Sequence, residues 1–479
     1  MSKTIADAKD LLLNDQSLSP AVKTVFGLIL VILDALMKRF KLNSSNSSKA
    51  PSTDSDQDKK KDKNKKPSGK KPGGQEGHTG TTLMPVAHPD VIVDIAVDQT
   101  DLPVGQYTPI GYKSAQVVDI KFTKFVTEYR AEIIKSEDGV KITAPFPIGV
   151  TRSIQYGASI KEHAVYLATA QFLPYERLKN QFLDQYKIDL SCGSIFNFIK
   201  EAAERLEPFQ ICAKNHLSQS IFMHADETGM QIKNKLHWLH SASNDVFTFL
   251  EPHAKRGRVA FDEINIIPHF QGILIHDHWA PYMSYNCEHA FCNAHHLREL
   301  TWSYEEEKQN WALEMRVLLE AMNVAVHEAG GVLTAEVAKP WVNRYTEIIN
   351  KGEIECPHRV AEEPSLDSFK KRGKVAQTKS RNLLKRLKDY QNETLRFLTN
   401  PLIPFTNNPA EQSLRMEKVK QKISGCYRSM ESAKDFALLR SYLLSCAKND
   451  VSASEALRLL FQGKWPAFVD KALLAVKGS

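Results

Sequence analysis

Apolar residues near the N-terminus recur at intervals of three and four: Val22, Val25, Ile29, Ile32 and Leu36. This heptad-like spacing predicts a helix over residues 1–42 with a continuous apolar stripe. Because a short helix of this kind is marginally stable alone, we expect a second copy to cover the stripe and the protein to be a homo-oligomer. A helix packed on its own chain is the alternative.

The pattern disappears over residues 43–80, where Ser, Lys, Pro and Gly dominate. Such a composition cannot bury a core, and it predicts a disordered basic linker. Its lysines could bind DNA phosphates, although a solvated linker explains them equally well. The candidate DNA contacts in the linker are Lys59, Lys60, Lys65 and Lys66.

Residues 81–150 contain short alternating stretches such as VIVDIAV and VKITAPFPI, separated by turn signals. This alternation predicts a small β-rich module. Residues 151–215 have helical periodicity in three segments, the last of them opened by Ser191 or Ser194. The turn KIDLSCG joins the last two segments, so they could form a helix-turn-helix that reads a DNA major groove. Plain helical packing is the alternative.

Residues 216–479 begin with strand-like runs. SIFMHADE, KLHWLHSA and VFTFLEP predict three strands, RGRVAFDEIN predicts a helix, and FQGILIHDH predicts a fourth strand. A helical stretch at about residues 300–400 then predicts an insertion into the sheet domain. The expected fold class is therefore multidomain α/β.

Composition excludes several classes of protein. At 479 residues and 42% hydrophobic, the chain can bury two to four domain cores. The seven cysteines are scattered and do not form a disulfide framework. The longest apolar run, Val25–Met37, is interrupted by Asp34 and is too short to cross a bilayer. We expect a cytoplasmic protein without a membrane span.

Three carboxylates have positions that suit metal-dependent phosphodiester chemistry. Asp226 and Asp277 each follow a predicted strand, and Glu411 opens a predicted helix. If they converge, they can hold two divalent cations that clamp the attacking and leaving oxygens, and such oxygen ligands favour Mg²⁺ or Mn²⁺. Each has a simpler explanation. Aspartates are common in turns, and Asn408 as N-cap with Pro409 first would put Glu411 third in a capping box.

Basic residues follow Glu411 along one face of its helix, at Arg415, Lys418 and Lys422. Their spacing of three and four indicates a stripe on which DNA can lie. Nine Lys or Arg between Lys370 and Lys388 form a second basic cluster. A solvated helix face is again the alternative.

A group of cysteines and histidines precedes the insertion: Cys287, His289, Cys292, His295 and His296. These are the residue types of a zinc site, but their spacing matches no common zinc finger. We therefore favour a structural or substrate-facing role near Asp277, with zinc as the less favoured alternative. Arg298, at the start of the following helix, is a further candidate DNA contact.

Over most of its length the chain resembles the insertion sequence 66 family of bacterial DDE transposases. The matching motifs are NSSNSSKAPS, GGQEGHTGTTL, YGASIKEHAVYLATAQFLPYERL, HADET, HDHWAPY, CNAHHLREL and NNPAEQSLR. The resemblance implies an RNase H-like catalytic domain with a helical insertion and a catalytic triad of Asp226, Asp277 and Glu411. It also matches Cys292 and His295 to a Cys-x-x-His signature. Relatives carry a cysteine-based zinc module in the β-rich region, whereas this chain has no cysteine before Cys192.

The resemblance implies a nucleoid-associated enzyme that binds the ends of a mobile element, cuts them, and joins them to target DNA. Relatives are often encoded with small accessory proteins. A metal-dependent nuclease without strand transfer is one alternative. A noncatalytic DNA-binding remnant is another, and the missing cysteines favour it.

Overall fold

The computed structural model describes residues 83–98, 100, 102–359 and 375–478, and six isolated positions between 19 and 30. Of the predicted N-terminal stripe, Val22, Val25 and Ile29 are helical with exposed side chains. Ile32 and Leu36 lie outside the described residues, so self-association stays a prediction. The four linker lysines, Lys59, Lys60, Lys65 and Lys66, also lie outside the described residues.

The segment before residue 150 has much less strand than its alternating pattern predicts. It contains one antiparallel hairpin, formed by β1 (Ile133–Lys135) and β2 (Lys141–Thr143). Its apolar side chains, such as Ile92 and Ile95, are exposed. A two-stranded hairpin buries little, and no second layer covers it among the described residues, which explains why alternation alone does not give a β-rich module here.

A helical module follows, with four helices where three segments were predicted. The helices are α4 (Ala158–Thr169), α5 (Tyr175–Tyr186), α6 (Cys192–Glu204) and α7 (Glu207–Ser218). Ser191, one of the two predicted caps, accepts a hydrogen bond from the N–H of Ser194 at 2.9 Å and opens α6. Phe182 of α5 and Phe198 of α6 join the same core as the central sheet. DNA reading by α5 and α6 stays a prediction.

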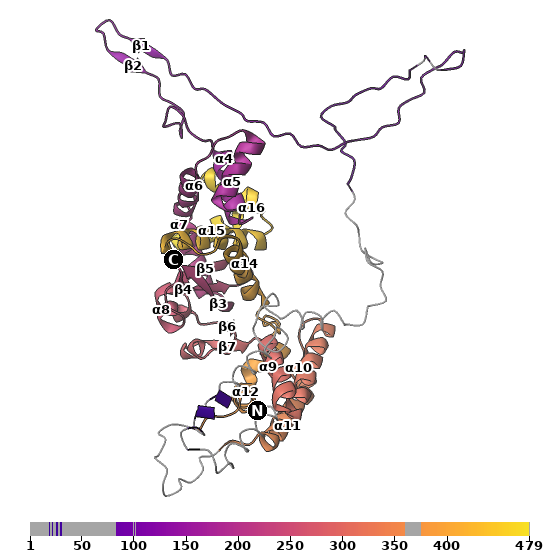
Figure 1. The fold of residues 1–479 in the computed structure, drawn as a ribbon, viewed down its shortest axis with the longest axis vertical. Coiled ribbons are helices and arrows are strands. Elements are labelled where there is room, and N and C mark those ends of the chain that lie inside the picture. The colour runs from indigo at the N-terminus through magenta and orange to yellow at the C-terminus, as the bar shows by residue number, and fades with distance from the viewer. Residues whose placement is uncertain are drawn as a thin grey trace.

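The central sheet has five strands in the order β5-β4-β3-β6-β7 (Figure 1). The strands are β3 (Phe222–Ile232), β4 (Lys235–Ser243), β5 (Thr248–His253), β6 (Ile273–His276) and β7 (Glu288–Phe291). β3, β4 and β5 are antiparallel, whereas β3, β6 and β7 are parallel. The four predicted strands and the helix between them, α8 (Arg258–Ile264), are confirmed. The short β7 was not predicted.

Helices cover the antiparallel half of the sheet. α14 (Asn408–Ser424) packs on β3 and β4, and α15 (Met430–Lys448) packs on β5. The hydroxyls of Ser441 and Ser445 on α15 accept hydrogen bonds from the N–H groups of Leu250 and Thr248, at 2.8 and 2.9 Å. Helix α15 thereby provides hydrogen-bond acceptors for the N–H groups of the edge strand β5, which would otherwise lack partners. The last helices, α16 (Ala453–Phe461) and α17 (Ala467–Gly478), pack on α4 and α7.

The predicted insertion forms a helical body, drawn in Figure 1 at the end of the molecule away from α4 to α6, and its core also includes Ile273, Ile275 and Ala290 of β6 and β7. Its helices are α9 (Asn293–Glu307), α10 (Asn310–Glu328), α11 (Ala335–Glu355), α12 (Lys379–Asp389) and α13 (Gln391–Leu395). Trp311, Met315 and Tyr345 are buried at its centre. Its two ends meet, because the N–H of Asn293 donates to the carbonyl of Phe405 at 3.0 Å.

The basic cluster predicted on α12 is largely occupied by contacts within the insertion. Arg381 pairs with Glu353 at 2.5 Å, Arg386 pairs with Glu299 at 3.0 Å, and Lys379 lies 4.5 Å from the ring centre of Trp302. Since these cations join α12 to α9 and α11, the described part of the cluster is not a free DNA surface. Among the described helices, none has the length and apolar character that crossing a membrane requires.

Candidate active site

The register of two parallel strands brings the two predicted aspartates together. His224 of β3 pairs with Ile275 of β6. Asp226 comes two residues after this pair on β3, and Asp277 comes two residues after it, directly beyond the end of β6 at His276. Burial, and then the charges of Glu227, Asp277 and Glu411, raise the pKa of Asp226 well above its usual value. The carboxylates therefore repel one another, which a bound cation would relieve.

Glu411 lies in the first turn of α14, and its helix does not begin as predicted. Asn407, not Asn408, is the N-cap residue, Asn408 is the first helical residue, and Glu411 is the fourth. The predicted capping box is therefore wrong. The side chain of Asn407 does not cap α14, because it forms hydrogen bonds with β3 instead.

Asn407 ties α14 to the strand that carries Asp226. It is 1% exposed, its Oδ1 pairs with Nδ1 of His224 at 2.8 Å, and its Nδ2 donates to the carbonyl of Ala225 at 2.8 Å. Its backbone N–H donates to Sγ of Cys292 at 3.1 Å. One buried side chain thus fixes the start of the Glu411 helix against β3, directly beside Asp226.

Asp277 lies in a loop that the insertion holds in place. Its Oδ1 accepts the N–H of Trp279 at 3.1 Å. The next residue, His278, pairs through Nε2 with Oε1 of Glu299 at 2.6 Å, and Arg386 donates to the same carboxylate. Burial alone would raise the pKa of Glu299, but the hydrogen bond with His278 and the charge of Arg386 lower it to about 2. Glu299 is therefore a fixed anionic anchor for this loop.

Glu227, next to Asp226, has a different environment. Its Oε1 accepts two hydrogen bonds from Arg256, from Nε at 2.8 Å and from a terminal nitrogen at 2.5 Å. Its Oε2 accepts the hydroxyl of Tyr282 at 2.5 Å. The guanidinium of Arg256 lies between two tryptophans, with its carbon 3.8 Å from the ring centre of Trp279 and 4.7 Å from that of Trp238.

Cys292 and His295, matched to the Cys-x-x-His signature, both lie beside Glu411. Sγ of Cys292 and Nδ1 of His295 are each 3.9 Å from Oε1 of Glu411. Burial raises the pKa of Cys292 to about 11. Burial, and then the charge of Arg298, lower the pKa of His295. Arg298 is therefore close to His295.

The basic stripe predicted on α14 is divided among three environments. Arg415 lies 3.6 Å from Glu411, with its side chain 65% exposed. Lys418 donates to the carbonyl of Gly229 on β3, and burial lowers its pKa. Lys422 is exposed. Only Arg415 and Lys422 are therefore available to phosphates from this stripe.

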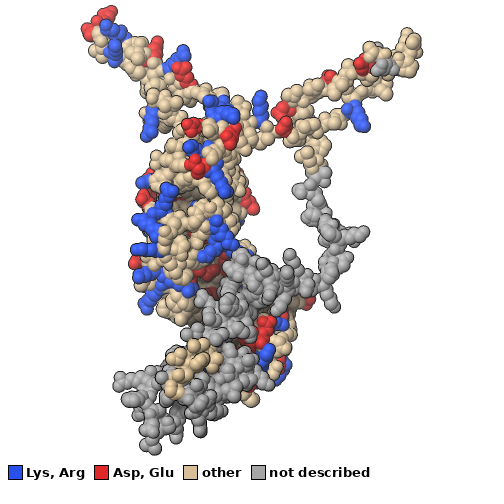
Figure 2. All heavy atoms as spheres, in the orientation of Figure 1, with Lys and Arg blue, Asp and Glu red and all other residues tan. Residues whose placement is uncertain are grey.

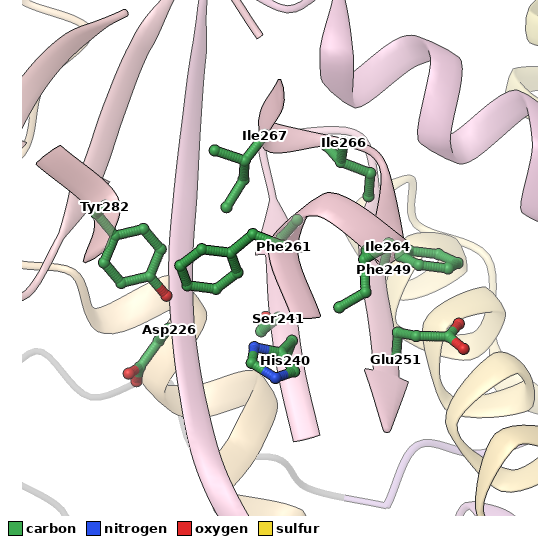
Figure 3. Close-up of a pocket in the computed structure, with 11 residues that line it drawn as sticks. Asp226, His240, Ser241, Phe249, Glu251, Phe261, Ile264, Ile266, Ile267 and Tyr282 are labelled. Carbon is green, nitrogen blue, oxygen red and sulfur yellow. The ribbon is translucent and has the colours of Figure 1, made fainter. Parts of the chain in front are cut away.

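The donor set suits hard divalent cations. Asp226, Asp277 and Glu411 supply carboxylate oxygens, the ligands that Mg²⁺ and Mn²⁺ prefer. Figure 3 shows Asp226 on its strand near the ring of Tyr282, at the margin of a pocket lined by His240, Ser241 and Phe261. Most of that lining is apolar, so the pocket does not offer a second set of oxygen ligands.

Several residues of this region were not identified from the sequence. Asn407 stands beside Asn408, and either asparagine could have opened the helix. Glu227 is adjacent to Asp226 in HADET, but its partners come from distant parts of the chain. Glu299 lies in a helix whose pattern gives no sign of contact with His278. A buried carboxylate is recognised only when its partners are known.

Comparisons with known proteins give two family matches. A family model described as "Transposase IS66 family" matches residues 153–435, more than half of the chain. A family of unknown function, DUF6444, matches residues 28–84. No curated protein matches the chain.

Proposed function

Since this chain belongs to the IS66 family of transposases, we propose that it cuts DNA at the ends of a mobile element and joins those ends to target DNA with divalent metal ions. One observation carries this proposal. Asp226, Asp277 and Glu411 come from two strands and a helix far apart in sequence, and their charges act on one another.

The topology supports an RNase H-like catalytic domain. Three antiparallel strands continue into two parallel ones, in the order β5-β4-β3-β6-β7. Asp226 lies on the central strand and Asp277 follows its parallel neighbour. The helical insertion separates this pair from Glu411, as the family resemblance implies.

Asp226, Asp277 and Glu411 would hold Mg²⁺ or Mn²⁺. When bound, these cations supply Lewis-acid activation of the attacking oxygen and stabilise the leaving oxygen of an in-line displacement. The attacking group is water in the cleavage step and the freed 3′-hydroxyl in the joining step. In each step one P–O bond forms and another breaks.

The chain's own residues organise this chemistry before DNA arrives. Asn407 fixes the start of α14 against β3, so Glu411 and Asp226 are already close to each other. Glu299, through His278, holds the loop of Asp277. Arg415 and the exposed Lys422 on α14 can contact phosphates and set the position of the strand without reading its sequence.

The ends of the mobile element would bind to surfaces outside the carboxylate site. Figure 2 shows Lys and Arg side chains along the side of the molecule that carries α4 to α8. We propose that α6 is the recognition helix and that the basic linker adds sequence-independent affinity.

The decisive experiment incubates the purified protein with labelled element-end DNA, target DNA and Mg²⁺. Wild type should release cut ends and form joined products. Asp277→Asn should lose both activities while retaining DNA binding, because the phosphate contacts lie elsewhere. Asp450→Asn is the matched control, since Asp450 is exposed and has a positive φ of 57° that asparagine also adopts.

Three outcomes separate the candidate functions. Joined products that require Asp277 support the transposase. Cut products without joining would indicate a nuclease, and binding without either product would indicate a noncatalytic remnant. Full strand transfer by Asp277→Asn would exclude the assigned triad.

A further inference from the structure

A cluster beside the proposed catalytic centre has a different chemical character. Cys292, His295 and Glu411 each present a ligand atom, and these atoms all lie within 4.8 Å of one another. Sulfur and imidazole nitrogen are poor ligands for Mg²⁺ but are preferred by Zn²⁺ and similar cations. Glu411 therefore belongs to two sets of candidate ligands, one with Asp226 and Asp277 and the other with Cys292 and His295.

The spacing is close to that of a tetrahedral site. Bond lengths of about 2.0 Å to oxygen or nitrogen and about 2.3 Å to sulfur place such ligands roughly 3.3–3.5 Å apart. The distances from Oε1 of Glu411 to Sγ of Cys292 and to Nδ1 of His295 are both 3.9 Å, and all three ligand atoms lie within 4.8 Å of one another. The ligands would have to approach one another by about half an ångström or more to close the site, and three protein ligands leave a fourth position open.

The first two ligands are oriented before any cation binds. Cys292 is 1% exposed, and its Sγ accepts the N–H of Asn407 at the start of α14. Nδ1 of His295 is buried and has no hydrogen-bond partner among the described residues. A buried nitrogen without a partner is unfavourable, and a proton or a cation between it and the carboxylate would satisfy both groups.

We propose that Cys292, His295 and Glu411 form a binding site for a transition-metal cation such as Zn²⁺, which withdraws Glu411 from the Mg²⁺ set. Occupation would switch strand cleavage off. The inhibitory consequence rests on the proposed function, whereas binding of the cation does not.

The test is a titration of the full-length protein with Co²⁺, which reports a thiolate ligand by a charge-transfer band in the near ultraviolet. Wild type should develop the band, and Zn²⁺ should abolish it by displacement. Cys292→Ser should lose the band. His295→Ala should weaken Co²⁺ binding by at least about 10-fold, the lower end of the loss caused by removing even an outer-shell partner.

Two controls make the result specific. Cys287→Ser should keep the band, since Cys287 is a half-buried thiol 3.9 Å from a different histidine, His289. Asp226→Asn should also keep it, because Asp226 is outside the ligand set. If Cys292→Ser does not fold, judged by its circular dichroism, His295→Ala still tests the site, because the His295 side chain is 18% exposed and tolerates change better.

No thiolate band in wild type, or a band that survives Cys292→Ser, would overturn this inference. Joined DNA products without a cobalt band would leave the proposed function standing and remove the zinc site. A cobalt band without joined products would leave the metal site standing and remove the proposed function. With both present, Zn²⁺ at concentrations that displace Co²⁺ should inhibit strand cleavage in excess Mg²⁺.

Discussion

Asp226 and Glu227 are neighbours on β3, yet their environments are opposite. Glu227 is paired with Arg256 and Tyr282 through both of its oxygens. Asp226 accepts the backbone N–H of Glu227 at 2.8 Å and is otherwise dominated by burial and nearby negative charge. Successive side chains on a strand point to opposite faces of the sheet, so one residue step separates the two environments.

The comparison shows two neighbouring carboxylates whose charges are balanced in different ways. Burial and then the charge of Asp277 raise the pKa of Glu227, while Tyr282 and Arg256 oppose this rise and satisfy its hydrogen bonds. If Asp226 binds a cation as proposed, that cation would offset the repulsion from the neighbouring carboxylates.

The largest effect is expected from Asp226→Asn. Strand cleavage should fall by about 1000-fold or more, corresponding to roughly 4 kcal/mol of lost transition-state stabilisation. Thermal unfolding without divalent cations should shift upward, because a repelled buried charge has been removed. Cleavage assays and differential scanning calorimetry measure the two changes, with Asp450→Asn as control. If Asp226→Asn lowered the melting temperature and left cleavage unchanged, Asp226 would have a structural role and the proposed catalytic role would be wrong.

Glu227→Gln should lower stability and leave cleavage nearly unchanged, and its effect should be smaller than that of Asp226→Asn. It leaves the charge of Arg256 unpaired, so we expect the free energy of unfolding to fall by about 1–3 kcal/mol. Cleavage per folded molecule should stay within a few-fold of wild type. Urea unfolding followed by fluorescence checks the first value. Tyr282→Phe, which removes one hydrogen bond to the same carboxylate, should cost about 1 kcal/mol and calibrates the result. An unchanged midpoint in both variants would contradict a structural role for Glu227.

The pH dependence of stability should sharpen the contrast further. The pKa of Asp226 is raised in the folded chain, by burial first and then by Glu227 and Asp277. Between the ordinary value of 3.8 and the raised value, the folded chain holds a proton that the unfolded chain has released. Stability without divalent cations should therefore fall as pH rises above about 4, by at most about 1.4 kcal/mol per pH unit.

Two changes should flatten that slope. Asp226→Asn removes the titrating group, and Mg²⁺ at 100 times its dissociation constant should add about 2.7 kcal/mol at neutral pH. Unfolding midpoints measured from pH 5 to pH 8, with and without Mg²⁺, test both. A slope that is the same in wild type and Asp226→Asn would mean that other groups dominate.

The order of elements was predictable because the periodicity is strong where burial is strong. The four predicted strands of the sheet carry clear apolar patterns and lie at their expected places, whereas the insertion was predicted only as one helical stretch at about residues 300–400. β7 was missed because it has only four residues, Glu288–Phe291, with a charge and a histidine among them. The β-rich module was overpredicted because alternation describes one strand and says nothing about a second layer.

The site was predictable only in part, for a physical reason. Asp277 follows β6 as predicted, whereas Asp226 lies inside β3, which continues to Ile232, and not at the predicted strand end. The groups that hold them act across the fold: Asn407 reaches His224 and Ala225, and Glu299 reaches His278. Such partners are separated by up to 183 positions in the chain, so no local pattern encodes their contact.

The insertion leaves and re-enters the sheet domain at neighbouring points. Asn293 and Phe405 are hydrogen-bonded to each other, and Cys292 meets Asn407, 115 positions later. The stem is not the whole attachment, because Glu299 and Arg386 of the insertion also hold His278 beside Asp277. A change in the length of the insertion that keeps both attachments should therefore leave Asp277 in place, whereas a change that removes Glu299 should release its loop.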